Sequence, residues 1–555
     1  MRNRETLGKK VFRVVLIKPS HYDDDGYVIR WYRSMIPSNT LAALYGLCRD
    51  LAERKVLGEG VEITISAIDE TNTRVSIPDI IKEISADGGL VAFAGVQTNQ
   101  FPRTMDIATV FRNEGIQVCI GGFHVSGCLA MLPELPQELQ DALDMGISLF
   151  AGEAEGSLDE VFIDAYRGEL KPIYNRMSTL PALESHPTPF LPAEIIHRSA
   201  ASCSSFDAGR GCPFLCSFCT IINVQGRKSR FRSVDDIENI VRENAKQKIR
   251  RFLITDDNFA RNKDWEKIFD RLILLREQEG LQVRLFLQVD AMCHRIPNFI
   301  EKAAQAGVIF VFIGLESINS ENLLSAGKRQ NKFSEYRKTL QAWQNEKIMT
   351  VVGYIAGFPA DTPESIADDF RLMHQELPMD FLQLSLMTPL PGSADHKKLH
   401  EAGEWMDTDL NKYDLNHITT KHPTMSADAL QRAFEDAQDF FYADEQVKTR
   451  LKRSYASGLN IHRAALGNVW YSCCRLEGVS GPDGGVFRLK DRLDRRPGMP
   501  VENPFVFYPK LMLHRIRIYS KLAFMYLKYR RMCQAILADP NAAQYTDASF
   551  SKADD

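Results

Sequence analysis

Short apolar runs alternate with amphipathic stretches along the first third of the chain. Between residue 11 and about residue 167, each apolar run is separated from the next by enough sequence for a helix. Short apolar runs predict buried strands, and stretches with a 3.6-residue period predict helices. Regular alternation of the two predicts right-handed crossovers and a parallel, doubly wound sheet. The expected strands are 14–17, 63–68, 90–95, 117–120 and 148–151, and the expected helices are 38–53, 77–87, 102–113 and 156–167.

A second α/β pattern begins after the proline-rich segment 180–192. Six further apolar runs follow, each again separated by room for a helix. Six strand–helix units are two fewer than an eight-fold barrel requires, so they predict a partial (β/α)6 TIM-type barrel. The expected strands are 204–207, 251–255, 283–288, 308–313, 350–356 and 381–387.

The last part of the chain has a helical pattern without recognisable motifs. Helices are expected at 427–443 and 447–458, followed by a glycine-rich basic loop at 478–500 and a basic, aromatic, amphipathic helix at 509–531. That helix either packs on its own domain or lies on an anionic membrane surface. The polar tail 539–555 predicts disorder. The expected domains are therefore 1–180, 195–428 and a mainly helical region, 429–555, with a disordered tail.

Composition narrows the class of protein. The 555 residues are 44% hydrophobic and 25% charged, with a net charge of −4, which is ordinary for a globular protein and gives no reason to expect nucleic acid. A chain of this length predicts two to four domains. No uncharged apolar run reaches 18 residues, so no membrane span is expected. The polar start, residues 1–6, lacks a signal-peptide pattern, which predicts a cytoplasmic protein.

Three cysteines, Cys212, Cys216 and Cys219, form a C-x3-C-x2-C motif. Three thiolates on one tight loop can bind three irons of a [4Fe–4S] cluster and leave the fourth iron open. S-adenosylmethionine (SAM) can chelate an open iron, and its reductive cleavage yields a 5′-deoxyadenosyl radical. Structural zinc is an alternative, but it requires four ligands, and Cys203 is the candidate for the fourth. The other cysteines are scattered and predict reduced thiols, mostly buried.

The cysteine spacing, with Phe218 before the last cysteine, resembles the radical SAM superfamily. Motifs at the ends of the predicted barrel strands follow in the same order as in that superfamily: Asp256-Asp257-Asn258, Gln288-Val-Asp290, Gly314-Leu-Glu316-Ser317, Gly353-Tyr-Ile-Ala-Gly-Phe-Pro359 and Thr388-Pro-Leu-Pro-Gly-Ser393. An acidic residue at a strand end is commonly a helix cap, and this remains the alternative for Asp256. The SAM-binding residues that the resemblance implies are Phe218, Asp257, Gln288, Asp290, Glu316, Tyr354 and Gly357.

The doubly wound domain placed before this motif resembles the Rossmann-like cobalamin-binding domain of class B radical SAM enzymes. Turns at 121–124 (Gly-Gly-Phe-His) and 152–155 (Gly-Glu-Ala-Glu) carry the resemblance. The Asp-x-His-x-x-Gly motif of other cobalamin modules is absent around His21, so we expect the lower face of cobalt to be unligated or water-bound, with His21 as the alternative ligand. A sheet that has lost its cofactor and serves in docking is a further alternative. The implied cobalamin-binding residues are Ser20, His21, Gln97, Thr98, Gly121, Gly122, His124, Gly152 and Glu153.

These resemblances imply a cobalamin-dependent radical SAM enzyme with three cofactors: a [4Fe–4S] cluster, SAM and cobalamin. The expected activity is C-methyl transfer to an unactivated carbon. The alternatives are an oxidative cyclase or a carbon–carbon coupling enzyme without methyl transfer and, in another class, an iron–sulfur electron-transfer or sensor protein. Expected partners are a small-molecule or lipid-like substrate and a reductase, flavodoxin or ferredoxin as electron donor. The basic run 227–232 is either a solvated face or a site for a substrate anion or an acidic donor.

Overall fold

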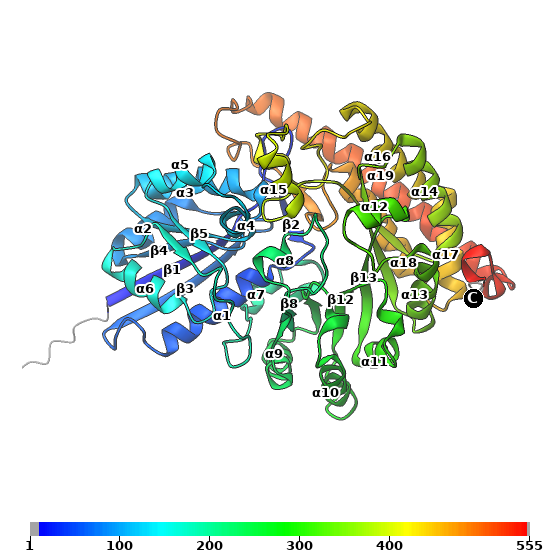
Figure 1. Ribbon diagram of the computed structural model, residues 1–555, viewed down its shortest axis with the longest axis horizontal. Coiled ribbons are helices and arrows are strands. Elements are labelled where there is room, and N and C mark those ends of the chain that lie inside the picture. Colours follow the sequence, from blue (N-terminus) through cyan, green and yellow to red (C-terminus); the bar gives the residue numbers. More distant parts are fainter. Residues whose placement is uncertain (1–9, 552–555) are drawn as a thin grey trace, which may run out of the picture.

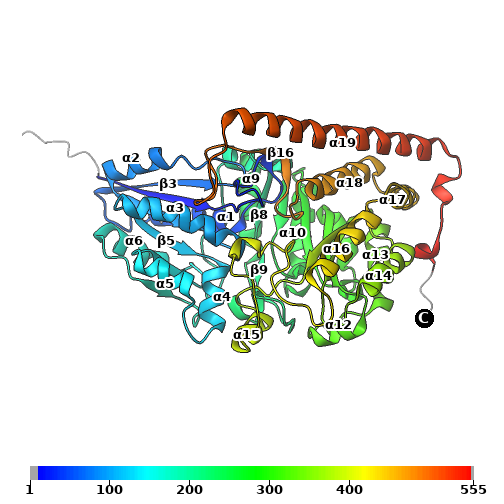
Figure 2. The ribbon, with the colours of Figure 1, turned by 90° about the horizontal axis from the view of Figure 1, so that it is seen from above.

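The computed structural model describes residues 10–551. The polar residues 1–6 and the end of the acidic tail, 552–555, lie outside the described residues. Two α/β units stand side by side, with the N-terminal unit in blue and cyan and the second in green (Figure 1). A long C-terminal helix runs along one edge of the molecule (Figure 2).

The N-terminal unit contains a six-stranded parallel sheet with the strand order β3-β1-β4-β5-β6-β7. Helices cover both faces, because alternate residues of each strand point to opposite sides. Val14 and Leu16 of β1 pack toward α1 and α6, whereas Val15 and Ile17 pack toward α2, α3 and α5. The predicted doubly wound sheet is therefore confirmed. Its strands are β1 (Lys10–Lys18), β3 (Val61–Asp69), β4 (Gly89–Phe93), β5 (Gln117–Gly121), β6 (Ser148–Ala151) and the unpredicted β7 (Ile173–Asn175).

The helices of this unit begin and end close to the expected residues. They are α1 (Asn39–Glu53), α2 (Ile77–Asp87), α3 (Phe101–Asn113) and α6 (Leu158–Arg167). Two further helices, α4 (Phe123–Met131) and α5 (Gln137–Asp144), were not predicted.

The second unit is the predicted partial barrel. Its six parallel strands follow in sequence order, β8-β11-β12-β13-β14-β15, so that β8 and β15 remain the two edges. These strands are β8 (Cys203–Phe206), β11 (Arg251–Ile254), β12 (Arg284–Val289), β13 (Val308–Glu316), β14 (Met349–Ala356) and β15 (Phe381–Leu386). The helices that follow them are α9 (Val234–Lys246), α10 (Trp265–Glu277), α11 (Phe299–Ala306), α12 (Ser320–Ser325), α13 (Phe333–Asn345), α14 (Pro363–Glu376) and α15 (Ala394–Glu401).

The C-terminal region covers the inner face of the barrel strands. Phe310, Val351 and Phe381 belong to a core that includes residues of the last three long helices. The ring of Phe381 stacks on Tyr471, with ring centroids 5.7 Å apart. The helices of this region are α16 (Ala427–Phe441), α17 (Asp444–Ala456), α18 (Ile461–Leu476) and α19 (Pro504–Ala538).

Two features of the C-terminal region differ from the prediction. The loop 478–500 contains β16 (Gly485–Leu489), which pairs antiparallel with β2 (Arg30–Ser34) of the N-terminal unit. The tail is ordered as far as residue 551: Asp547 lies 2.7 Å from Arg453 Nε, and Gln341 donates to the carbonyl oxygen of Ser549. Polar composition alone therefore does not produce disorder here, because these polar groups have partners. Across residues 10–551, no helix combines the length and apolarity that a bilayer crossing requires.

Candidate active site

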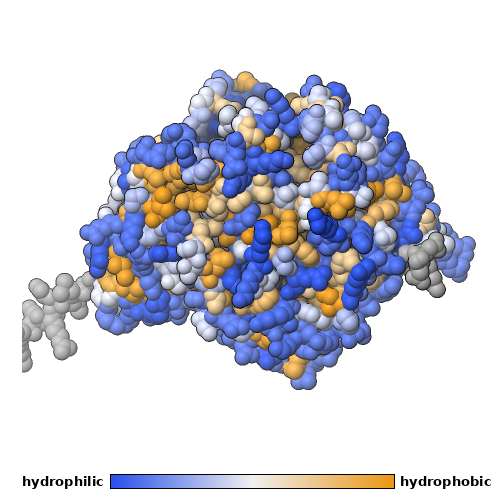
Figure 3. All heavy atoms as spheres, viewed as in Figure 1, coloured by the Kyte–Doolittle hydropathy of each residue, from blue (hydrophilic) through white to orange (hydrophobic). Residues whose placement is uncertain are grey.

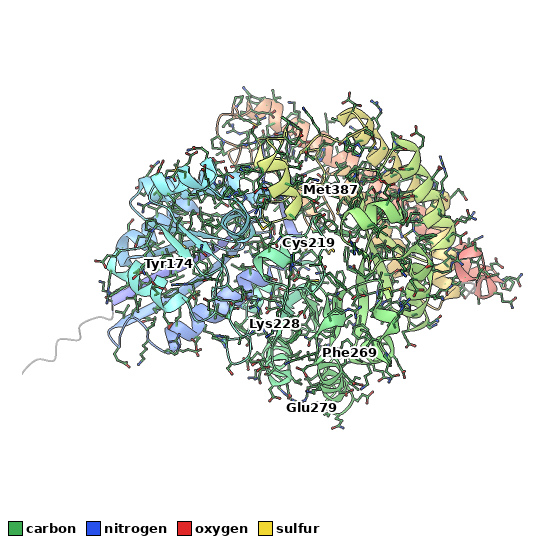
Figure 4. All side chains as sticks on the ribbon, viewed as in Figure 1. Tyr174, Cys219, Lys228, Phe269, Glu279 and Met387 are labelled. Atoms are coloured by element: carbon green, nitrogen blue, oxygen red, sulfur yellow. The ribbon has the colours of Figure 1, made fainter. Side chains whose placement is uncertain are left out.

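The three motif cysteines lie in the loop between β9 (Gly209–Arg210) and the short helix α8 (Ile221–Val224). The loop is pinned to the barrel, because the Ser217 N–H donates to the Ala326 carbonyl at 3.0 Å and the Cys212 N–H donates to the Gly226 carbonyl at 3.2 Å. Figure 4 shows Cys219 near the centre of the molecule, where hydrophobic and intermediate residues gather on the same face in Figure 3. The loop therefore lies where the two α/β units meet.

Burial raises the pKa of all three motif thiols, and that of Cys219 reaches about 12. The positive charge of Lys328 opposes this shift at Cys212 and Cys216. A bound metal deprotonates a coordinating thiol outright, so the thiols are suited to bind a metal rather than to react as free nucleophiles.

The distances argue against zinc at this loop. Three thiolates around one tetrahedral zinc ion lie about 3.8 Å apart, given a Zn–S bond of about 2.3 Å. Within residues 10–551, the metal-ligating triplet whose ligand atoms all lie within 4.8 Å of one another is His124, Cys128 and Glu138, not the three motif cysteines. Cys203 begins β8, at the end of that strand away from the loop, and its Sγ donates to the Ser204 carbonyl at 3.3 Å. The sulfur atoms of the three motif cysteines do not all lie within 4.8 Å of one another, which suits a multi-iron cluster better than a single zinc ion.

The three carboxylates predicted to bind SAM differ in how many hydrogen bonds and ion pairs they already form with the protein. Asp290 accepts from Arg261 Nε at 2.6 Å and from Asn258 Nδ2 at 2.8 Å, so its oxygens are already occupied. Glu316 accepts from Lys328 Nζ at 2.6 Å. Asp257 is held by backbone N–H groups, and burial raises its pKa to about 7. Asp257 is thus the carboxylate best placed to pair with a cation beside the cysteines.

Strand alternation separates the other predicted residues. Gln288 shares the inner face of its strand with Phe286. A β-bulge interrupts β13 between Gly314 and Glu316, and the Glu316 carboxylate folds back over Gly314. Tyr354 points to the outer face, where its hydroxyl donates to Asp369 at 2.6 Å, so the structure does not bring its side chain to the site. Two other predicted residues lie in or beside the cysteine loop. Phe218 of that loop contacts Phe358 edge-on. Gly357, next to Phe358 in the sequence, donates its N–H to Asp361.

A mostly apolar pocket opens between the N-terminal sheet and the α1–α6 layer. Its walls come from β1, β4, β5 and β6, and its mouth includes the turns at Gly121, Gly122, Gly152 and Glu153. Arg210, Val224 and Gln225, which flank the cysteine loop, also line it. One pocket therefore reaches from the sheet of the N-terminal unit to the segment that carries the three cysteines. Sequence reasoning missed Asn39, Thr40 and Arg210 among the lining residues.

The glycine turns are explained by packing within the protein. A Cβ atom on Gly122 (φ +153°) would lie 2.1 Å from the Val96 nitrogen, and one on Gly152 (φ +99°) would lie 2.9 Å from the Arg176 carbonyl carbon. We expected these glycines to be needed for close approach to a ligand, but the neighbouring backbone already requires them.

Sequence similarity identifies the domain that carries the cysteines. Residues 208–373 match the radical SAM superfamily. The chain carries a radical SAM domain. The bacteriochlorophyllide d C-12(1)-methyltransferase of Chlorobaculum tepidum is 27% identical over 346 residues, which are 61% of this chain and 72% of that protein.

Two solved structures share the fold across both α/β units. The cobalamin-dependent radical SAM enzyme OxsB, with aqua-cobalamin and SAM bound, superposes with a TM-score of 0.56 at 14% identity and covers 97% of this chain and 82% of its own. The methyltransferase TsrM of Kitasatospora setae gives 0.53 at 17% identity and covers 70% and 76%. The fold expected from the resemblance is thus confirmed.

Five residues predicted to contact cobalamin do not line the pocket. Ser20 donates to the Ile29 carbonyl, and the His21 carbonyl accepts from the Ile29 N–H, which holds both in a loop against the β2 segment. Gln97 is exposed. Thr98 and His124 contact each other, with Thr98 Oγ1 3.3 Å from His124 Nδ1.

Buried ion pairs join the pocket turn to the radical SAM domain. Arg210 donates to Glu153 at 2.8 Å, to Glu155 at 2.7 Å and to Asp207 at 3.1 Å, and Arg230 also binds Glu153. Burial alone would raise the pKa of Asp207, but Arg210 and Arg232 hold it at about 2. The carboxylate of Glu153, expected at cobalamin, is therefore occupied by arginines. Within the basic run 227–232, Arg230 and Arg232 are buried or half-buried, and Arg227 and Lys228 remain exposed.

Proposed function

We propose that this protein is a cobalamin-dependent radical SAM C-methyltransferase. The observation that supports it most strongly is the shared pocket: residues at the strand ends of the N-terminal sheet and residues beside the cysteine loop line the same space. Methylation of an unactivated carbon requires both a hydrogen-abstracting radical and a separate methyl donor close to it. A pocket that extends to the radical SAM loop supports this proposal, because cofactors held at its two ends would both be within reach of one substrate.

The residues present fit these groups. When bound, the cluster with SAM supplies the 5′-deoxyadenosyl radical, and cobalamin supplies the methyl group. Cys212, Cys216 and Cys219 would hold the cluster. Asp257 would accept a hydrogen bond from the SAM amino group, and its pKa, raised to about 7 by burial, would fall beside that cation. The apolar walls formed by α1, β1 and α6 would bury the flat, poorly charged parts of cobalamin and exclude water.

Lys328 carries a positive charge close to the cysteine loop. Its ammonium group binds Glu316 Oε1 and the Gly314 carbonyl, and its charge acts on Cys212 and Cys216. A cation there offsets part of the negative charge of a thiolate-bound cluster. The exposed Arg227 and Lys228 beside the loop would attract an acidic flavodoxin or ferredoxin, or the acidic surface of a reductase.

Product labelling distinguishes this activity from the alternatives. Full-length protein, reconstituted anaerobically with iron, sulfide and cobalamin, is incubated with methyl-deuterated SAM and a small-molecule extract from cells lacking the protein. We expect S-adenosylhomocysteine and 5′-deoxyadenosine together, with the methyl label in a product. 5′-Deoxyadenosine with an altered but unlabelled product would instead indicate a cyclase or coupling enzyme. No change in the cluster's EPR spectrum on addition of SAM would indicate an electron-transfer or sensor protein.

We further propose that α19 contacts an anionic membrane surface and gives access to a lipid-like substrate. One row of α19, including Ile518 and Tyr529, is buried on the protein, but a second row is exposed along the edge seen in Figure 2. Leu513 is 65% exposed and Phe524 is 66% exposed. Lysines and arginines alternate with these apolar residues along the helix, which suits an interfacial helix on anionic lipid.

Vesicle co-sedimentation tests the contact of α19 with membranes. The protein is expected to bind phosphatidylglycerol vesicles more tightly than phosphatidylcholine vesicles, and less at high salt. Leu513→Asp combined with Phe524→Asp should weaken binding at least tenfold, because each buried side chain contributes about 2 kcal/mol. Leu466→Asp, at an exposed leucine of α18, is the matched control and should bind normally. Equal binding by the double variant and the wild type would contradict the proposal.

A further inference from the structure

A second group of metal-ligating side chains lies outside the radical SAM site. His124, Cys128 and Glu138 each offer one ligand atom, and these atoms all lie within 4.8 Å of one another. His124 and Cys128 are four residues apart on α4 and therefore share one face of that helix. Glu138 comes from the first turn of α5. None of the three lines the apolar pocket.

His124 directs a weakly satisfied nitrogen, Nε2, toward the other two side chains of this group. The residue is fully buried, and its Nδ1 lies 3.3 Å from Thr98 Oγ1. Its Nε2 lies 3.5 Å from Glu138 Oε1, which is at the outer limit of a hydrogen bond, and no shorter contact satisfies it. So long a contact is uncommon for a fully buried imidazole nitrogen and calls for an explanation. If Nδ1 carries the proton toward Thr98, Nε2 presents a lone pair to Cys128 and Glu138, which is the arrangement typical of a metal-ligating histidine.

A fourth side chain lies on α15, the helix that follows the last barrel strand. His396 of α15 is buried, and its Nδ1 has no hydrogen-bond partner. Burial lowers the pKa of His396 to about 4, and His124 and Glu138 lie close enough to act on this ring electrostatically. Helix α4 packs directly on the turn before α15, since a Cβ on Gly127 would lie 2.3 Å from the Pro391 carbonyl oxygen. The group therefore sits at the junction of the two α/β units.

We propose that His124, Cys128 and Glu138 bind a zinc ion, with water in the fourth position beside His396. Imidazole, thiolate and carboxylate are the three protein ligands that zinc uses, and the mixed set disfavours Mg²⁺ and Ca²⁺, which prefer oxygen alone. A closing movement of about 1 Å would bring the ligand atoms to tetrahedral spacing. The ion would stiffen the junction between α4, α5 and α15 and would hold the turn 121–124 at the mouth of the pocket.

Elemental analysis of the full-length protein tests this site independently of its activity. Protein purified anaerobically from zinc-supplemented cells is measured for iron, cobalt and zinc in one sample by plasma mass spectrometry. We expect one zinc per chain in addition to the cluster iron. Glu138→Gln and Cys128→Ser should each lower zinc about tenfold or more while the iron content is retained. Cys293→Ser, at an equally buried cysteine of the barrel, should keep both metals.

Two results of the elemental analysis and one spectroscopic result would overturn the zinc site. The first is wild-type protein with far less than one zinc per chain after supplementation. The second is full zinc in Glu138→Gln, a partly exposed position at which misfolding would not confuse the result. X-ray absorption at the zinc edge locates the ion: one sulfur neighbour at about 2.3 Å is expected, whereas three would place zinc in the cysteine loop and contradict the proposal. Cys216→Ser should lose iron and keep zinc, which separates this inference from the proposed function.

Discussion

Replacing Cys216 by serine is expected to remove the iron–sulfur cluster and to reduce 5′-deoxyadenosine formation by at least about 10³-fold. The three cysteines act as one unit, because a cluster held by two thiolates is not retained beside an open iron. The triple variant of Cys212, Cys216 and Cys219 should therefore be no less active than each single variant. Iron content, the EPR spectrum of the reduced protein and the yield of 5′-deoxyadenosine measure this effect.

Cys203→Ser is the matched control for this prediction. Cys203 lies close in sequence but begins β8, at the end of the strand away from the loop, and its thiol donates to a backbone carbonyl. The variant should keep its iron and its SAM cleavage. Loss of the cluster in Cys203→Ser would mean that a fourth thiolate ligates the metal. That result would close the open position and remove the basis for radical chemistry.

Most of the fold could be predicted because its strands are short apolar runs, and several of them are buried on both faces. All eleven expected strands, five in the N-terminal sheet and six in the barrel, appear close to the expected residues. The exceptions have physical causes. Strand β7 has three residues, too few to give a period. Strands β2 and β16 pair across about 450 residues of sequence, and neither strand alone predicts its partner.

Motif resemblance located the candidate site but not the orientation of its side chains. The cysteine spacing identified the cluster loop, and the strand-end motifs identified Asp257 and Glu316. The Tyr354 side chain points away from the site because the residue before it, Gly353, faces Phe312 on the inner side, and successive residues of a strand point to opposite faces. The glycine turns marked the mouth of the pocket correctly, although the protein's own backbone, rather than a ligand, accounts for two of those glycines.

Charge pairing between distant segments explains the remaining differences. Glu153 and Arg230 each looked available for a ligand when considered alone. In the folded protein they bind each other and share their surroundings with Arg210, Glu155 and Asp207. Single-sequence patterns do not reveal which charges meet, because the segments are joined by tertiary packing rather than by local structure.

Replacing Arg210 by methionine is expected to lower the free energy of the first urea-induced unfolding transition by about 3–5 kcal/mol. The substitution leaves Asp207, Glu153 and Glu155 without their shared cation in a buried place. Arg54→Met is the matched control, because Arg54 also binds two carboxylates, Asp50 and Asp159, but on the surface. An exposed pair is worth about 1 kcal/mol or less, so the control should be nearly neutral.

The loss of stability in Arg210→Met should depend on pH. In the wild type, the lowered pKa of Asp207, about 2, contributes stability that is present above its ordinary value of about 4 and is lost as the pH falls toward 2. In the variant, Arg210 no longer lowers the pKa values of the buried carboxylates. Burial then raises these values, and the carboxylates take up protons on folding. The difference between the two proteins should therefore be largest near pH 7 and should shrink at pH 4, which urea titrations at both values measure.

The same variant should also uncouple the two half-reactions. Arg210 holds the turn 152–155 of the N-terminal unit against the loop that carries the cysteines, so its loss should loosen one unit relative to the other. The cluster loop itself stays intact, because its cysteines and their backbone contacts are unchanged. We expect 5′-deoxyadenosine to continue while S-adenosylhomocysteine and labelled product fall several-fold. Equal stability of Arg210→Met and Arg54→Met, or an unchanged ratio of the two products, would show that the arginine does not join the two units.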